Sequence, residues 1–141
     1  MAYKIDFGEK LFSSLKLTVL LAFKEPGNQT YIIKKIMRNP LFLGQKSEDA
    51  TEKDKQVVTD LLDTLQANLD HCVVTAAKMI GVKKNIIVVA AGPFQFAMIN
   101  PVITRKSGAF ETEEGCLSLD GVRSCTRYEE IEVDHCNGIV I

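Results

Sequence analysis

A chain of 141 residues with 46% hydrophobic and 25% charged residues can bury the core of one domain, and its composition argues against intrinsic disorder. The 17 basic and 18 acidic residues leave a net charge of −1. No global field therefore draws the chain to nucleic acid or to an anionic membrane, and we expect no nucleic-acid specificity and no membrane contact. The basic cluster of Lys34, Lys35 and Arg38 is interpreted as a solvated face.

Four cysteines lie at positions 72, 116, 125 and 136, and no two have the C-x-x-C spacing. The single candidate targeting segment, residues 17–23, is too short to span a bilayer, follows acidic residues and precedes no small-x-small cleavage site. We therefore expect reduced thiols in a cytoplasmic protein. A structural zinc site stays open as an alternative, although the usual ligand spacing is missing.

Residues 1–30 stand apart from the rest as an extension of unknown role. They end in the turn-rich stretch Glu25-Pro26-Gly27-Asn28-Gln29-Thr30. Two interpretations remain open for the extension. It is either an extra strand or hairpin at the domain edge, or a poorly ordered segment.

A helical pattern follows from Ser47 onward. Apolar residues recur at three- and four-residue spacing, which places them on one helix face: Val58, Leu61, Leu62, Leu65 and Leu69. Charged residues fill most of the opposite side, namely Asp49, Glu52, Lys53, Lys55, Asp60 and Asp63. Ser47 or Thr51 can serve as N-cap. The pattern predicts a helix from about 48 to 70 that ends near His71, a partner for its dipole.

Strands follow the helix. The β-branched run at 85–90, closed by Gly92-Pro93, predicts a buried strand. Residues 96–100 predict a second strand, which Pro101 interrupts or ends. Residues 122–133 mix apolar with charged residues and predict a third. One long amphipathic helix packed on antiparallel or mixed strands indicates an α+β domain.

The segment Glu114-Gly115-Cys116-Leu117-Ser118 resembles the second motif of the peptide deformylases, E-G-C-L-S. In that family the cysteine thiolate binds the catalytic metal, and the backbone N–H of the following leucine points at the substrate carbonyl oxygen. The residue types suit this chemistry, because glycine lets the backbone approach closely and a thiolate is a soft ligand for Fe(II) or Zn(II). The plain alternative is a buried structural cysteine in a turn.

Three further segments resemble the same family in the same order. Residues 72–81 are similar to its first motif, G-φ-G-φ-A-A-x-Q, and residues 36–41 to its opening strand and proline. Residues 132–139 resemble the tail of its third motif, H-E-x-D-H, and the usual sequel. The resemblance thus covers residues 31–141 as one deformylase-like domain.

The resemblance implies a metal-dependent amide hydrolase that removes the N-formyl group from the N-terminal formylmethionine of nascent peptides. It implies Fe2+ or Zn2+ as cofactor, a formylated nascent peptide as substrate, and a place near the ribosome in N-terminal methionine processing. It assigns Cys116 and His135 as metal ligands, Glu132 as general base, and the Leu117 N–H as half of the oxyanion hole.

Several positions depart from the family pattern. Cys72 and Val74 occupy the two glycine positions of the first motif. Met79 replaces the glutamine that hydrogen-bonds the oxyanion, and a thioether cannot donate. Loss of one such donor typically costs on the order of a hundred- to a thousand-fold in rate. Ile131 stands where the first metal histidine belongs, which leaves two of the three protein ligands usual for a catalytic site.

The spacing between the second and third motifs is also short. Only sixteen positions lead from Cys116 to Glu132, so the domain looks shortened between 130 and 134. Three hypotheses stay open: a weak deformylase, a catalytically inactive relative that binds a peptide or partner, or a chain from which residues near 131–134 are missing. We expect an intact chain without a bound metal.

Overall fold

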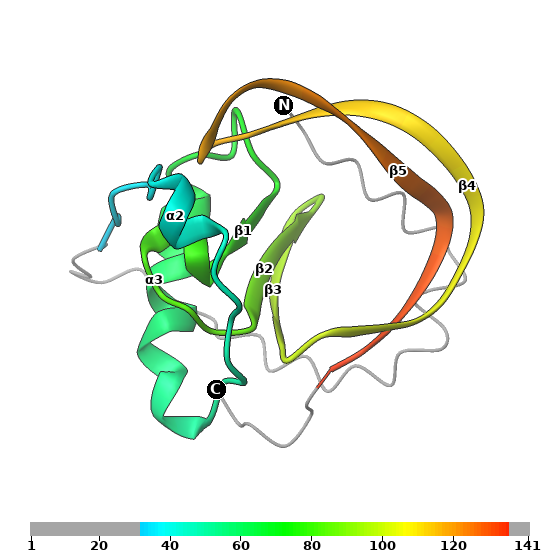
Figure 1. The fold of residues 1–141 in the computed structure, drawn as a ribbon. Coiled ribbons are helices and arrows are strands. Elements are labelled where there is room, and N and C mark those ends of the chain that lie inside the picture. Colours follow the sequence, from blue (N-terminus) through cyan, green and yellow to red (C-terminus); the bar gives the residue numbers. More distant parts are fainter. Residues whose placement is uncertain (1–31, 136–141) are drawn as a thin grey trace.

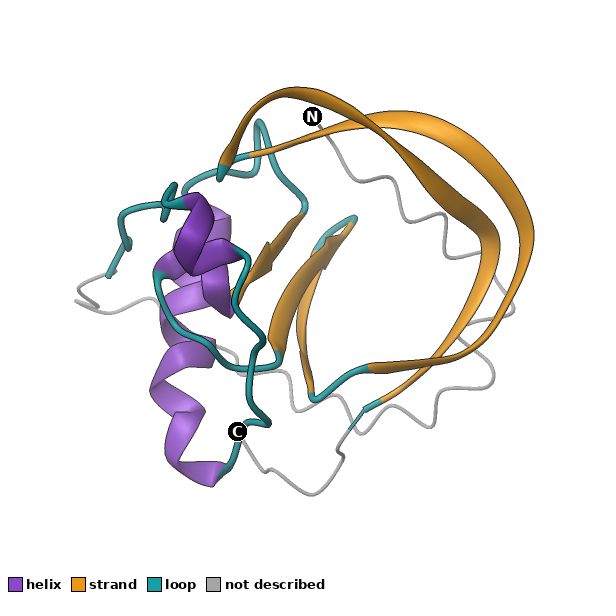
Figure 2. Ribbon diagram, in the orientation of Figure 1, coloured by secondary structure: helices purple, strands orange, loops and turns teal. Residues whose placement is uncertain are grey.

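The computed structural model describes residues 32–135, so the extension predicted over residues 1–30 lies outside the described residues (Figure 1). The elements follow the order α2 (Pro40–Leu43), η1 (Glu52–Asp54), α3 (Lys55–Gln66), β1 (Val74–Ala76), η2 (Ala77–Ile80), β2 (Ile86–Ala91), β3 (Phe94–Ile99), β4 (Val102–Cys116) and β5 (Leu119–Asp134). Helices gather on one side of the strands (Figure 2), so the predicted α+β class is confirmed. No helix within residues 32–135 is long and apolar enough to cross a membrane.

The long helix is shorter than predicted, because local hydrogen bonds end it on both sides. Before it, the Thr51 hydroxyl accepts from the Lys53 N–H and the Asp54 carboxylate accepts from the Thr51 N–H. This capping box starts the 3-10 turn η1 instead of an α-helix. After Gln66 the chain turns, and the Asn68 carbonyl accepts from the N–H groups of both His71 and Cys72 at 2.9 Å.

The predicted apolar face of α3 is confirmed as the centre of the core. Val58, Leu61 and Leu65 are fully buried, and Leu62 and Leu69 pack beside them. The same cluster contains Ile86, Val88 and Ile99 from the adjacent strands. Burial of this face against the sheet holds α3 in place.

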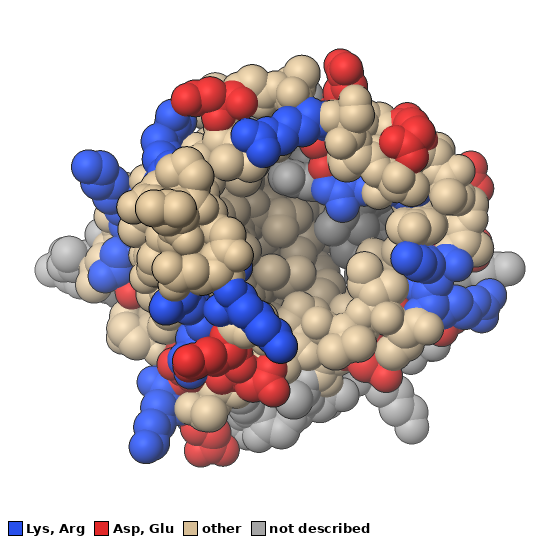
Figure 3. All heavy atoms as spheres, in the orientation of Figure 1, with Lys and Arg blue, Asp and Glu red and all other residues tan. Residues whose placement is uncertain are grey.

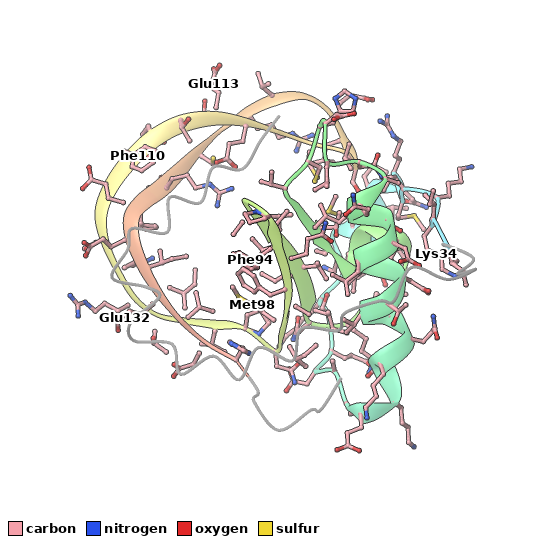
Figure 4. The ribbon with its side chains drawn as sticks, turned by 180° about the vertical axis from the view of Figure 1, so that it is seen from behind. Lys34, Phe94, Met98, Phe110, Glu113 and Glu132 are labelled. Atoms are coloured by element: carbon pink, nitrogen blue, oxygen red, sulfur yellow. The ribbon has the colours of Figure 1, made fainter. Side chains whose placement is uncertain are left out.

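The polar side of α3 differs from the prediction. Asp60 and Asp63 are buried, although the pattern placed them toward solvent. The segment at 32–34 covers them: the Ile32 N–H donates to the Asp63 carboxylate at 3.1 Å, and the Lys34 ammonium lies 3.3 Å from the Asp60 carboxylate. Figure 4 shows Lys34 beside this helix. Helical periodicity cannot reveal such a cover, because its partner lies some thirty residues away.

A second difference concerns residues 36–41, which do not form the opening strand expected from the resemblance. Asn39 instead caps α2, and its side-chain oxygen accepts from the Leu41 N–H at 3.0 Å. Pro40 takes the first helical position, where its missing N–H costs nothing. The Met37 N–H donates to the Met79 carbonyl at 2.8 Å, which ties this segment to η2.

The first sheet has the order β1-β2-β3 with antiparallel pairs throughout. The predicted strand at 85–90 is confirmed as β2, and the second strand ends at Ile99, before Pro101. Asn100 makes the turn at a φ of 51°, and its side chain both accepts from the Ala50 N–H and donates to the Ala50 carbonyl. This clamp ties the sheet to the segment that leads into α3.

The third predicted strand is confirmed as part of β5, which pairs with β4 in a long antiparallel hairpin. The pairing runs from Val102 with Asp134 at one end to Cys116 with Leu119 at the other. β5 continues without interruption through residues 131–134. The hairpin arcs away from the first sheet, and its tip returns to the side of the molecule where α2 lies (Figure 1).

Candidate functional site

The first- and second-motif segments meet at one cavity of 360 Å³. The turn after α3 and η2 contribute one wall, and the end of β4 with the hairpin tip contributes the other. The lining residues are Arg38, His71, Cys72, Met79, Gly115, Cys116, Leu117, Gly121 and Val122. The fold therefore brings together two segments that the sequence separates by more than thirty residues.

The hairpin tip is anchored where it reaches this cavity. Leu117 packs against the hydrophobic core, and Ser118 is buried beside it. Arg38 donates to the Asp120 carboxylate at 2.9 Å, across the tip. Gly121 has a φ of 73°, a left-handed conformation that suits glycine in the turn. These contacts fix Cys116 at the cavity wall.

Cys72 occupies a first-motif glycine position and faces the cavity as a buried thiol. It is 4% exposed, and its sulfur donates to the Val74 carbonyl at 2.7 Å. Burial raises the pKa of the Cys72 thiol, and the nearby Cys116 acts in the same direction. Cys72 therefore remains protonated at neutral pH, which makes it a poor metal ligand without rearrangement.

Met79 stands where the family places its oxyanion glutamine, and its surroundings match the expected loss of a donor. The side chain is buried, and its sulfur accepts a hydrogen bond from the Ala76 N–H at 3.4 Å. A thioether held in this way brings no N–H to the cavity. An oxyanion in the cavity would thus lack this one stabilising partner.

The hairpin register separates the proposed metal ligands. Cys116 pairs with Leu119 at the tip, whereas Asp134 pairs with Val102 at the opposite end and His135 follows it. Glu132 also lies near that far end, where its carboxylate binds Arg105 at 3.1 Å in an exposed ion pair. Figure 4 shows Glu132 and Glu113 at different ends of the arc.

The resemblance assigns Cys116 and His135 to one metal site, and the described residues do not bring these two side chains together. Residues 128–134 continue strand β5 in register with β4 and carry His135 away from Cys116. Within residues 32–135, no group of three His, Cys, Asp or Glu side chains could hold a metal ion. A three-ligand Fe2+ or Zn2+ site does not fit this arrangement.

A second cavity of 160 Å³ lies on the hairpin itself and shares Cys116 with the first. Its polar wall is the ion pair between Glu114 and Arg127, in which the Nε and Nη2 atoms of the guanidinium donate to the two carboxylate oxygens. The Arg127 guanidinium holds the pKa of the Glu114 carboxyl below its usual value. This bidentate pair fixes the strand ladder just before Cys116.

Three residues of the first cavity were not identified from the sequence. Arg38 was interpreted as part of a solvated face, and His71 as a dipole partner of a helix that ends earlier, at Gln66. Cys72 was interpreted only as a replacement of a first-motif glycine, and not as a thiol that lines the same cavity as Cys116. The available signal was its place in the first motif. Figure 3 shows this face hollowed between the hairpin and the other elements, with basic and acidic side chains mixed around the rim.

Comparison with known proteins gives consistent matches. The family model for polypeptide deformylase matches residues 30–140. A peptide deformylase from Clostridium beijerinckii is 58% identical over 104 residues, which cover 74% of this chain and 76% of that protein. Peptide deformylase 2 from Clostridium acetobutylicum is 39% identical over 75 residues, or 53% of this chain. The chain spans about half the length of this second relative.

The solved structures agree with the observed fold. A peptide deformylase from Legionella pneumophila has 29% identity and a TM-score of 0.63, covering 73% of this chain and 64% of that one. A class I type b peptide deformylase from Acinetobacter baumannii, bound to Met-Ala-Ser, has 20% identity and a TM-score of 0.63, covering 75% and 77%. At that identity the second match shows the fold alone.

Proposed function

The chain belongs to the polypeptide deformylase family, and on that premise we propose that its cavity binds the N-formylmethionine end of a peptide, with hydrolysis of the formyl group weak or lost. The proposed ligand is the formylated end of a nascent peptide. We also propose that the protein acts in the cytoplasm and near the ribosome, in the N-terminal processing of new chains.

One observation carries the proposal, namely the convergence of the two motif segments on one cavity. Its volume of 360 Å³ lies at the small end of the range for ligand pockets, about 300–1,000 Å³. Met79, Leu117 and Val122 give it apolar walls that suit a methionine side chain. The Leu117 N–H is our candidate to bind the formyl oxygen, as half of an oxyanion hole.

The same geometry explains why hydrolysis is proposed to be weak or lost. Cys116 is the proposed metal ligand at the cavity, but His135 and Glu132, proposed as second ligand and general base, lie at the other end of the hairpin. Ile131 offers no ligand, and Met79 offers no hydrogen bond to an oxyanion. We therefore derive no hydrolytic step through Fe2+ or Zn2+ from this arrangement.

A second candidate is a catalytically inactive relative that binds a peptide or protein partner through the same cavity. The separation of Cys116 from His135 favours it. The two candidates share the binding step and differ only in turnover. Binding and formate release must therefore be measured on the same protein.

The test uses the full chain incubated with Fe2+ or Zn2+ and the peptide formyl-Met-Ala-Ser, with unformylated Met-Ala-Ser as matched ligand. Titration calorimetry is expected to show tighter binding of the formylated peptide than of the unformylated one. Formate release is expected to be at least about a hundred-fold below that of the Legionella pneumophila enzyme assayed alongside, because the donor at Met79 is lost. Met79→Gln is expected to raise any release that is detected.

Two variants sharpen the result. If metal-dependent release is detected, Cys116→Ser is expected to abolish it, while Cys125→Ser, which changes a cysteine of the second cavity, leaves it unchanged. Binding without any formate release supports the inactive candidate. Equal affinity for both peptides would overturn the proposed ligand, and turnover equal to that of the reference enzyme would overturn the proposed loss of hydrolysis.

A further inference from the structure

Two cysteines from separate elements line the wall of the 360 Å³ cavity, and both are free thiols. Cys72 precedes β1, and Cys116 ends β4. We propose that they form a modification site, at which a peroxide oxidises Cys116 and Cys72 then closes a disulfide with it. This site is independent of any hydrolytic activity of the chain.

The packing around the cavity brings the wall that carries Cys72 and the wall that carries Cys116 together. Cys72 is a member of the hydrophobic core cluster, and Leu117, the residue next to Cys116, packs against that cluster. Beside them, the segment before α2 contacts both sides of the cavity, because Arg38 forms an exposed ion pair with Asp120 at the tip and the Met37 N–H donates to the Met79 carbonyl in η2. Both sulfur-bearing residues thus belong to packed segments that meet at the cavity.

Their different exposure sets the order of events. Cys116 is partly exposed at the cavity, so a small oxidant reaches it, whereas Cys72 is 4% exposed. The Cys116 thiolate attacks one peroxide oxygen, the O–O bond breaks, and water leaves after proton uptake, which gives a sulfenic acid. The Cys72 sulfur then attacks the Cys116 sulfur, the S–O bond breaks, and a second water leaves. Two thiols lose two hydrogen atoms in total, and hydrogen peroxide is reduced to water.

Cys125 is the natural competitor because it shares the second cavity with Cys116. The strand register keeps it away: Gly115 pairs with Val122, and Cys125 lies three residues further along β5. Three residues of strand correspond to about 10 Å. A disulfide needs Cα atoms about 4.4–6.8 Å apart, so the hairpin excludes this pairing without a register change. Cys125 is therefore a matched control.

Tryptic cleavage of this sequence distinguishes the possible disulfide pairings. Cleavage after lysine and arginine places the four cysteines in four peptides, residues 56–78, 107–123, 124–127 and 128–141. If Cys116 also serves as the metal ligand proposed above, the disulfide removes that thiolate from the metal. The disulfide is detected by mass and needs no activity, so its failure would leave the proposed function standing.

The experiment treats the full chain with hydrogen peroxide, alkylates the remaining thiols, and maps the tryptic peptides by mass spectrometry without reduction. The expected product joins residues 56–78 to residues 107–123, with the mass of two hydrogen atoms lost, and it disappears after reduction. Cys125→Ser retains the product, and Cys72→Ala replaces it with over-oxidised Cys116. A linkage of Cys116 mainly to another cysteine, or sulfinic and sulfonic acid at Cys116 in the unmodified sequence, would overturn the proposal.

Discussion

Leu65 offers the most direct test of the core packing, because its side chain, in the last turn of α3, is 0% exposed. Leu65→Ala removes three carbon atoms from the cluster that joins this helix to β2 and β3. At about 0.8 kcal/mol for each buried carbon, the transfer contribution alone is roughly 2.4 kcal/mol. The unfilled cavity adds to this, so we expect a loss of about 2–5 kcal/mol in the free energy of unfolding.

The loss is measured by urea denaturation followed by circular dichroism, with the slope of the transition compared between variants. Leu41→Ala is the matched control, since it makes the same substitution at a side chain that is 82% exposed on α2. It is expected to change stability by no more than about 0.5 kcal/mol. Equal effects of the two substitutions would refute both the phase of the helix and its packing on the sheet.

Three further predictions concern single side chains. The pKa of Glu114 lies below its usual value of 4.5 in the folded state, so its ion pair stabilises the protein above that pH. The stabilisation is lost as the pH falls through the folded-state pKa. The melting temperature should therefore vary less between about pH 3 and 6 in Glu114→Gln than in Glu113→Gln, the same change at the exposed neighbour. Thr75→Val should stabilise by about 1 kcal/mol, measured by urea denaturation, because the buried Thr75 hydroxyl has no hydrogen-bond partner among the described residues. Gly108→Ala should lower the melting temperature more than Gly121→Ala, since both have positive φ but only at Gly108 would the new Cβ lie 2.6 Å from a Glu129 oxygen.

The sequence predicted the elements whose pattern is local. The spacing of Val58, Leu61 and Leu65 indicated the buried face of α3, and the β-branched run at 85–90 indicated β2. Both signals depend only on neighbours within one element. The helix boundaries were less accurate, because the capping box at Thr51 competes with a longer helix and sequence spacing cannot decide between them.

Long-range contacts could not be predicted in the same way. The helical pattern predicted that Asp60 and Asp63 face solvent, but in the structure the segment at 32–34 covers both side chains. The strand tendency of residues 122–133 was evident from the sequence, whereas the resemblance assigned His135 to the same metal site as Cys116. In the structure the strand prevails, because β4 supplies a partner along its whole length. The motif resemblance assigned roles to Glu132 and His135, but the pairing of β5 with β4 determines where these residues lie.

The candidate site was likewise predicted where the signal is local and missed where it depends on long-range contacts. Cys116 and Leu117 were identified from the second motif, and they line the cavity as expected of a functional segment. Cys72 and Arg38 were missed as cavity residues, because their proximity to Cys116 depends on how the hairpin tip docks. In that docking Leu117 packs against the core, and Arg38 forms an exposed ion pair with Asp120.

The central claim is that the cavity beside Cys116 binds the formylated end of a peptide, and an NMR titration tests it most directly. The full chain, labelled with nitrogen-15, is titrated with formyl-Met-Ala-Ser and then with Met-Ala-Ser. We predict that the largest changes in backbone amide signals occur at Met79, Cys116 and Leu117. These changes are expected at lower concentrations of the formylated peptide than of the unformylated one. Changes confined to the far end of the hairpin around Arg105 and Glu132, or identical responses to both peptides, would contradict the account.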